Sequence, residues 1–101
     1  MDVLEIIGLR SLKRGHEDIA ENLLAEVAGP AAEEGLRLEL YRRASVATDL
    51  SVHLHRSQDR GGARPSPLGL RLAAALREHG QVSHSVWEKT KTSDASQRRD
   101  P

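Results

Sequence analysis

Two histidines, His53 and His55, stand two residues apart in the segment DLSVHLH. In an extended strand such residues point to the same face, about 7 Å apart along the chain. Two imidazoles on one face can ligate zinc, iron or copper when a third ligand converges on them. Glu39, in the preceding alternating run, is a candidate for that ligand. The alternative is two partly exposed histidines at a dimer interface or at the rim of a pocket.

Tyr41 and His53 form a second pair with chemical potential. A phenol and an imidazole suit general acid–base work, or the orientation of a substrate, near neutral pH. The same pair is also explained by ordinary cross-strand packing of an aromatic ring on an imidazole. Trp87, the single tryptophan, either stacks on a planar ligand or fills an interface. We therefore take Tyr41 and His53 as catalytic candidates and Glu39, His55 and Trp87 as ligand-binding candidates, and we assign no metal ligand and no cofactor.

These side chains belong to a stretch of two alternating runs, from Leu36 to His55. Strict period-two alternation is typical of strands that are buried on one face only. The stretch therefore predicts an antiparallel hairpin with one leucine-rich face that needs a cover. That face carries Leu36, Leu38, Leu40, Leu50, Val52 and Leu54, and the other carries Arg37, Glu39, Tyr41, Ser51, His53 and His55.

Two amphipathic segments can supply the cover. A helical stripe runs from His16 to Ala28, where Gly29-Pro30 should end or kink the helix, with one further turn over residues 31–34. A second helix should begin at Ser66-Pro67, because Ser is a good N-cap and Pro suits the first helical position. It should stop at Gly80.

Two further strands complete the pattern. The segment 3–9 is apolar at odd and at even positions, so both faces of the strand are apolar. This is typical of a strand in the centre of a sheet. The segment 81–89 alternates as a last strand, on which His84 should face the helices and Trp87 the opposite side. Residues 57–64 should form a surface loop, and 90–101 a polar tail.

The resulting order, β-α-β-β-α-β, predicts an α+β protomer with a ferredoxin-like antiparallel sheet. Right-handed crossovers place both helices on one sheet face, which leaves the imidazole-bearing face without a helix. We expect a single domain over residues 1–89.

Composition excludes several classes of function. The 15 basic and 15 acidic residues balance, so no overall field attracts nucleic acid or a membrane surface. The chain has no Cys and no run of roughly 20 apolar residues, so disulfides and membrane helices are not expected. We expect a cytoplasmic protein. With only two aromatic residues, one Trp and one Tyr, the core should be thin, which favours association.

The runs LRLELYRR, DLSVHLH and HSVWEKT, in this element order, resemble the dimeric α/β-barrel superfamily. That superfamily includes the antibiotic-biosynthesis-monooxygenase-like and stress-responsive barrel proteins. The resemblance implies a homodimer whose helix-free sheet faces pack together, and a pocket for a small molecule. It also implies, for some members, oxygenation without a cofactor.

One departure concerns the first strand, where oxygenating members typically place an Asn. This strand offers only Glu5 as a polar side chain, and the single Asn, Asn22, lies in the first predicted helix. The sequence therefore leaves open whether the chain is an enzyme. The hypotheses are a monooxygenase-like enzyme for a small organic substrate, a non-enzymatic ligand-binding or dimerisation module, and a metal-binding protein through His53 and His55.

Overall fold

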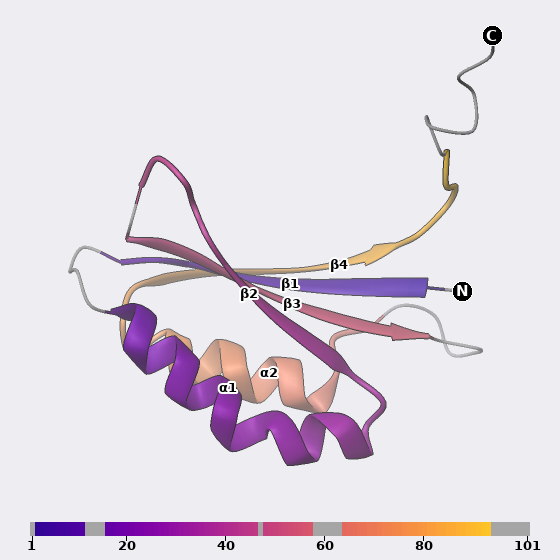
Figure 1. Ribbon diagram of the computed structural model, residues 1–101, viewed down its shortest axis with the longest axis horizontal. Coiled ribbons are helices and arrows are strands. Elements are labelled where there is room, and N and C mark those ends of the chain that lie inside the picture. The colour runs from indigo at the N-terminus through magenta and orange to yellow at the C-terminus, as the bar shows by residue number, and fades with distance from the viewer. Residues whose placement is uncertain (1, 12–15, 47, 58–63, 94–101) are drawn as a thin grey trace, which may run out of the picture.

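The computed structural model describes residues 2–11, 16–46, 48–57 and 64–93. Over these residues a sheet in the order β2-β3-β1-β4, with all neighbours antiparallel, carries both helices on one face (Figure 1). The predicted ferredoxin-like α+β fold is confirmed. The elements are β1 (Asp2–Arg10), α1 (His16–Glu33), β2 (Arg37–Arg42), β3 (Asp49–Ser57), α2 (Pro67–Leu76) and β4 (Gln81–Glu88).

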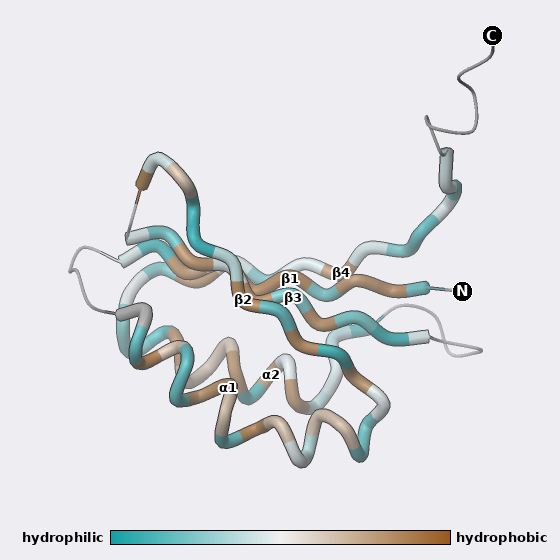
Figure 2. Tube along the Cα trace, viewed as in Figure 1, coloured by the Kyte–Doolittle hydropathy of each residue, from teal (hydrophilic) through white to brown (hydrophobic). Residues whose placement is uncertain are grey.

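The hydrophobic core lies between the helices and the sheet. Alternate strand residues face it, and in Figure 2 hydrophobic and hydrophilic segments alternate along the strands accordingly. The prediction that the leucine face of the hairpin lies beneath the helices is confirmed. The core residues include Ile7, Leu9, Ala20, Leu50, Val52, Leu54, Leu68, Leu72 and Leu76, and Leu38 and Leu40 pack against them.

Strand β1 has the central position that its apolar sequence predicts. It pairs with β3 on one side and with β4 on the other. Val3, Ile7 and Leu9 are buried beneath the helices, whereas Leu4 and Ile6 are half-buried on the helix-free face. β1 therefore contributes apolar surface to both faces of the sheet.

Gly29-Pro30 is predicted to end or kink helix α1; the helix does not end there, so the first of these two predicted outcomes is wrong. The helix continues through Pro30 to Glu33, in line with the extra turn expected over residues 31–34. Pro30 has no N–H to donate to the carbonyl of Glu26, and the turn beyond it is anchored by Ala31, which is buried in the core. Gly35, with φ at +72°, then reverses the chain into β2.

Helix α2 begins as its sequence predicts. Ser66 is the N-cap, its hydroxyl oxygen accepts a hydrogen bond from the amide of Gly69, and Pro67 occupies the first turn. Neither α1 nor α2 combines the length and the apolar character needed to cross a membrane.

Residues 58–63 of the predicted loop and 94–101 of the predicted tail lie outside the described residues. The tail residues that are described, 90–93, form neither helix nor strand. The single domain over residues 1–89 stays a prediction.

Candidate functional site

The helix-free face of the sheet is organised as three rows of side chains that cross the four strands. Strand register fixes which residues are neighbours, because directly paired residues of adjacent strands point to the same face. In the order β2, β3, β1, β4 the rows are Arg37–His55–Leu4–Trp87, Glu39–His53–Ile6–Ser85 and Tyr41–Ser51–Gly8–Ser83.

Four of the five sequence-predicted site residues form one cluster on β2 and β3. The ring centroids of Tyr41 and His53 are 4.4 Å apart, and those of His53 and His55 are 6.4 Å apart. His55 Nε2 lies 2.5 Å from Glu39 Oε1, and both side chains keep about a third of their surface exposed. We name Glu39, Tyr41, His53 and His55 the β2–β3 cluster. It brings a phenol, a carboxylate and two imidazoles within reach of one another.

The electrostatics of the cluster follow from these contacts. The hydrogen bond with His55, assisted by the charges of His55 and Arg37, holds the pKa of the Glu39 carboxyl below its usual value. Partial burial, together with the nearby charge of His55, lowers the pKa of the His53 imidazole. His53 is therefore predominantly neutral at neutral pH. A neutral imidazole has a lone pair with which it can accept a proton or bind a metal ion.

Trp87 is the predicted site residue that does not join the cluster. It lies in the same row as His55 but on β4, two strands away, which is about 10 Å in strand spacings. Its indole is 58% exposed, and its Nε1–H donates to Ser85 Oγ at 2.8 Å. Trp87 therefore offers an open aromatic surface on the far side of the same face.

Two hollows flank the β2–β3 cluster. A groove of about 690 Å³ at one end of the sheet includes His55, Arg37, Leu4 and Trp87 among its lining residues. A smaller hollow of about 220 Å³ is lined in part by Tyr41 and Ser51. The groove is the feature that connects His55 with Trp87. Neither His53 nor Glu39 lines either hollow.

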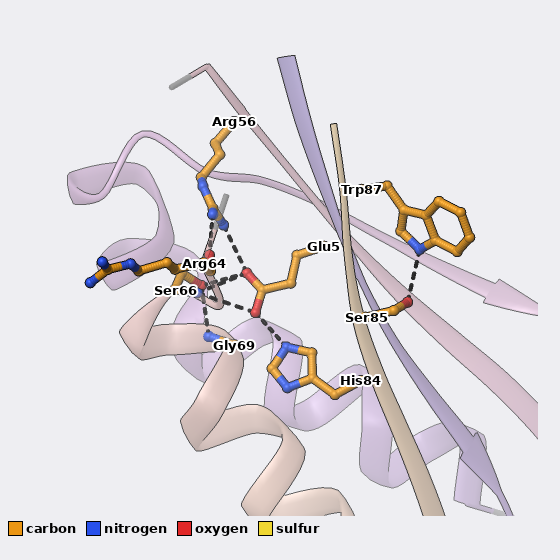
Figure 3. A network of polar contacts seen from close by, with 8 residues as sticks. All are labelled: Glu5, Arg56, Arg64, Ser66, Gly69, His84, Ser85 and Trp87. Atoms are coloured by element: carbon orange, nitrogen blue, oxygen red, sulfur yellow. Dashed lines mark hydrogen bonds and ion pairs between the residues drawn. The ribbon is translucent and has the colours of Figure 1, made fainter. Parts of the chain in front are cut away.

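The opposite face holds a polar cluster centred on the buried carboxylate of Glu5 (Figure 3). Arg56 Nη1 donates to Glu5 Oε1 at 3.0 Å, and His84 Nε2 lies 2.5 Å from Glu5 Oε2. Ser66 donates its hydroxyl to Oε1 at 2.8 Å and its backbone amide to the same carboxylate. We name Glu5, Arg56, Ser66 and His84 the Glu5 cluster. It ties β1, β3 and β4 to the N-terminus of α2.

The Glu5 cluster leaves no room for additional atoms at Gly69. A Cβ on Gly69 would lie 1.9 Å from Glu5 Oε2, so the carboxylate packs directly against the first turn of α2. The positive end of the helix dipole favours a negative charge at this place. Figure 3 also shows His84 pointing toward Glu5, and Trp87 pointing to the other side of the sheet. The orientations predicted for these two residues from strand alternation are confirmed.

Sequence reasoning did not identify the Glu5 cluster as a unit. Alternation marks Glu5 as the polar exception in an apolar strand and His84 as a residue that faces the helices, but it does not connect the two. The sequence does contain one signal: alternation places a single carboxylate at a buried position of a central strand. A buried charge needs hydrogen-bonding or charged partners, so such partners can be expected nearby. The identity of those partners depends on register and on the position of α2, which the sequence does not specify.

No protein-family model matches the chain, and no curated protein matches it either. Its structure is similar to that of a variant of SnoaB, a cofactor-independent oxygenase from Streptomyces nogalater, with a TM-score of 0.65 and 18% identity over 90% of this chain and 95% of that one. It is also similar to Rv0793 from Mycobacterium tuberculosis, with a TM-score of 0.63 and 22% identity over 93% of this chain and 100% of that one.

A third similar structure is an antibiotic biosynthesis monooxygenase, with a TM-score of 0.53 and 14% identity over 87% of this chain and 99% of that one. All three similarities extend over nearly the whole of both chains, so they concern the complete protomer fold. The chain therefore has the α+β fold of these proteins, and the predicted likeness to antibiotic-biosynthesis-monooxygenase-like proteins is confirmed as a likeness of fold.

Proposed function

We propose that the chain is a small monooxygenase-like enzyme that works as a homodimer, without a bound cofactor, on a planar phenolic substrate. Its helix-free face meets the same face of a second copy, and Tyr41 and His53 orient and deprotonate the substrate. The observation that carries the proposal is the proximity of the Tyr41 and His53 rings on this face, 4.4 Å apart. The fold shared with a cofactor-independent oxygenase supports the reaction class.

The chemistry needs a base and a hydrogen-bonding group, and the cluster offers both. His53 accepts the proton of the substrate hydroxyl, which leaves an electron-rich anion. Tyr41 then donates its own hydroxyl to the oxygen that carries the developing charge. The exposed indole of Trp87 and the groove that it shares with His55 offer a surface on which a flat ring system can lie.

Molecular oxygen is the oxidant in this proposal, and the substrate itself is the reductant. The anion transfers electrons to O₂, and a C–O bond forms at a ring CH₂ group that the phenol activates. The distal oxygen takes a proton to give a hydroperoxide. Loss of water then breaks the O–O bond and removes the remaining hydrogen from the carbon, which leaves a carbonyl group. The balance is R₂CH₂ + O₂ → R₂C=O + H₂O.

The dimer is supported by the chemistry of the helix-free face. Half-buried Leu4 and Ile6 occupy its centre, and the large rings of Tyr41 and Trp87 flank them with about half of their surface exposed. Burying this apolar surface against a second copy would compensate for a core that contains no Phe. A symmetric dimer requires a self-complementary patch, and a sheet face of this kind can provide one.

Oxygen uptake tests the enzymatic part of the proposal. Purified protein is mixed with polycyclic phenols that carry an activated ring CH₂, and the consumption of O₂ is measured together with the formation of the carbonyl product. We expect turnover that falls at least about 100-fold in His53→Ala and in Tyr41→Phe, since a positioned base contributes 10²–10⁴-fold. Ser83→Ala, on the same face but outside the cluster, is the matched control and keeps its activity. Equal rates in all four proteins would refute the mechanism.

A second candidate function is a non-enzymatic ligand-binding or dimerisation module. It is favoured by the finding that neither His53 nor Glu39 lines either of the two flanking hollows, while His53 Nε2 already contacts Ser51 Oγ at 3.0 Å. This function predicts that His53→Ala alters the dimer dissociation constant or the melting temperature without any turnover to lose. Sedimentation equilibrium of the wild type and of Ile6→Glu, which places a charge at the centre of the face, tests the shared assumption of a dimer. A monomeric wild type would remove that assumption from both functions.

A further inference from the structure

Glu39, His53 and His55 present three donor atoms that face a common point. One carboxylate oxygen and one ring nitrogen of each histidine all lie within 4.8 Å of one another. Glu39 is the direct cross-strand partner of His53, and His55 follows two residues later on the same face of β3. The three side chains are held by paired strands of one sheet, so their backbone positions are fixed independently of any ligand.

These separations are close to those of a bound metal ion. Ligands at 2.0–2.1 Å from a tetrahedral ion are about 3.3 Å apart. The contact of 2.5 Å between His55 Nε2 and Glu39 Oε1 therefore has to widen by about 1 Å, and the longest separation has to close by at most about 1.5 Å. Rotation about side-chain bonds supplies shifts of this size, because all three residues are only partly buried.

The donor set selects a class of ion. Two imidazoles and one carboxylate suit zinc and its neighbours in the first transition row, whereas magnesium and calcium prefer oxygen ligands alone. Three protein ligands leave a fourth position for water or for a substrate atom. Arg37 lies in the neighbouring row and its positive charge opposes a cation, but the negative charge of the Glu39 carboxylate, on which Arg37 also acts, offsets it.

We propose that Glu39, His53 and His55 form a binding site for one divalent transition-metal ion per chain, of the zinc class. The ion takes the same lone pair of His53 that the proposed base reaction uses. Metal binding and base chemistry at His53 are therefore mutually exclusive, and added zinc inhibits whatever activity the metal-free protein has. The metal site goes beyond the proposed function and does not depend on it, because binding is measured without any substrate.

Cobalt provides the direct probe. Protein without an affinity tag is treated with a chelator, dialysed and titrated with Co²⁺, whose visible absorption reports four-coordinate binding to nitrogen and oxygen ligands. Zn²⁺ is then added in competition and measured by calorimetry. We expect one ion per chain, and a loss of affinity of at least about tenfold in each of His53→Ala, His55→Ala and Glu39→Gln.

The control is His79→Ala, which removes a histidine from the turn that follows α2 and should leave Co²⁺ binding unchanged. Circular dichroism of each variant establishes that the fold is kept. Wild-type binding below one ion per chain overturns the proposal, as does equal affinity in the control and the three ligand variants. If His53→Ala loses oxygen uptake while Co²⁺ binding is unaltered, the metal site is refuted and the enzymatic proposal stands. If Co²⁺ binds as expected and no phenol is turned over, the metal site stands and the enzymatic proposal is refuted.

Discussion

The sheet carries the same contact twice, once on each face. Glu5 with His84 and Glu39 with His55 both place a carboxylate oxygen 2.5 Å from an imidazole Nε2. The surroundings differ, since the Glu5 side chain is 0% exposed and that of Glu39 is 37% exposed. Glu5 also receives bonds from Arg56 and from two groups of Ser66, whereas Glu39 sits beside a second imidazole and a phenol.

This difference separates a structural role from a chemical one. In the Glu5 cluster both carboxylate oxygens are hydrogen-bonded, and a Cβ on Gly69 would overlap Oε2, so the buried carboxylate is engaged by the protein itself, although Arg56 and Ser66 line a hollow of about 340 Å³. In the β2–β3 cluster Glu39, His53 and His55 are all partly exposed. Residue type alone therefore does not distinguish an anchor of the fold from a candidate site. The two roles are distinguished by the number of partners that each group has and by its burial.

The largest effect is expected from removing the buried carboxylate. Glu5→Ala removes the carboxylate that pairs with the largely buried Arg56, and loss of one member of such a pair costs about 3–5 kcal/mol of folding free energy. Urea unfolding followed by circular dichroism measures this cost. Glu39→Ala is the matched variant on the other face, and it should leave the midpoint nearly unchanged. Equal midpoints for the two variants would contradict the division of roles.

Gly69→Ala tests how closely the Glu5 cluster is packed. The new methyl group would overlap Glu5 Oε2, and overpacking of this kind costs about 1–3 kcal/mol. Gly29→Ala is the control in the other helix, where an added Cβ meets no atom within 4 Å. Because Ala favours a helix over Gly, that control should be stabilised by up to about 1 kcal/mol. Thermal melts that shift in the same direction for both variants would argue against the packing described.

A smaller loss is expected from Ser66→Ala. The variant loses the N-cap bond to the Gly69 amide and the hydroxyl bond to Glu5, while the backbone amide of residue 66 still donates to the carboxylate. Loss of a Ser cap costs about 0.5–2 kcal/mol. Equilibrium unfolding of Ser66→Ala and of the exposed Ser83→Ala provides the comparison. An unchanged stability in Ser66→Ala would show that the cap is dispensable.

The smallest effect concerns the pH dependence of the β2–β3 cluster. The pKa of His53 is lowered in the folded protein, so the unfolded chain binds a proton more readily. The stability that neutral His53 contributes is therefore complete above its ordinary pKa of 6.5, and it is lost as the pH falls through the lowered value. NMR titration of the metal-free protein, with chelator present, should place the midpoint of His53 below 6.5. A midpoint above 6.5 would contradict this assignment.

Most of the fold could be predicted from alternation and helix signals. The Leu36–His55 stretch has two clear period-two runs, which predict the hairpin. Ser66-Pro67 is a strong signal for the start of a helix, which predicts the beginning of α2. The C-terminal end of α1 could not be predicted from Gly29-Pro30 alone, because these local breaker residues say nothing about the core. The turn beyond Pro30 is anchored there by buried Ala31, and the helix continues to Glu33.

The candidate site was predictable as a face but not as a set of contacts. Alternation places Tyr41, His53 and His55 on the side away from the helices, as the register confirms. It cannot say that Glu39 lies opposite His53, because that depends on the length and shape of the β2–β3 connection. It also cannot place Trp87, which is adjacent to the cluster only if β4 lies next to β2 or β3, and β1 intervenes.

Pro30 also affects the local unfolding of helix α1. Without an amide hydrogen at position 30, the ladder of hydrogen bonds is interrupted at the carbonyl of Glu26. The last turn is held instead by buried Ala31, whose carbonyl accepts from the Leu36 amide at 2.8 Å. The parts of α1 before and after Pro30 can therefore unfold locally as separate cooperative units. Amide protons before Pro30 should exchange with deuterium in one kinetic group, and the Leu36 amide should remain protected together with the strands.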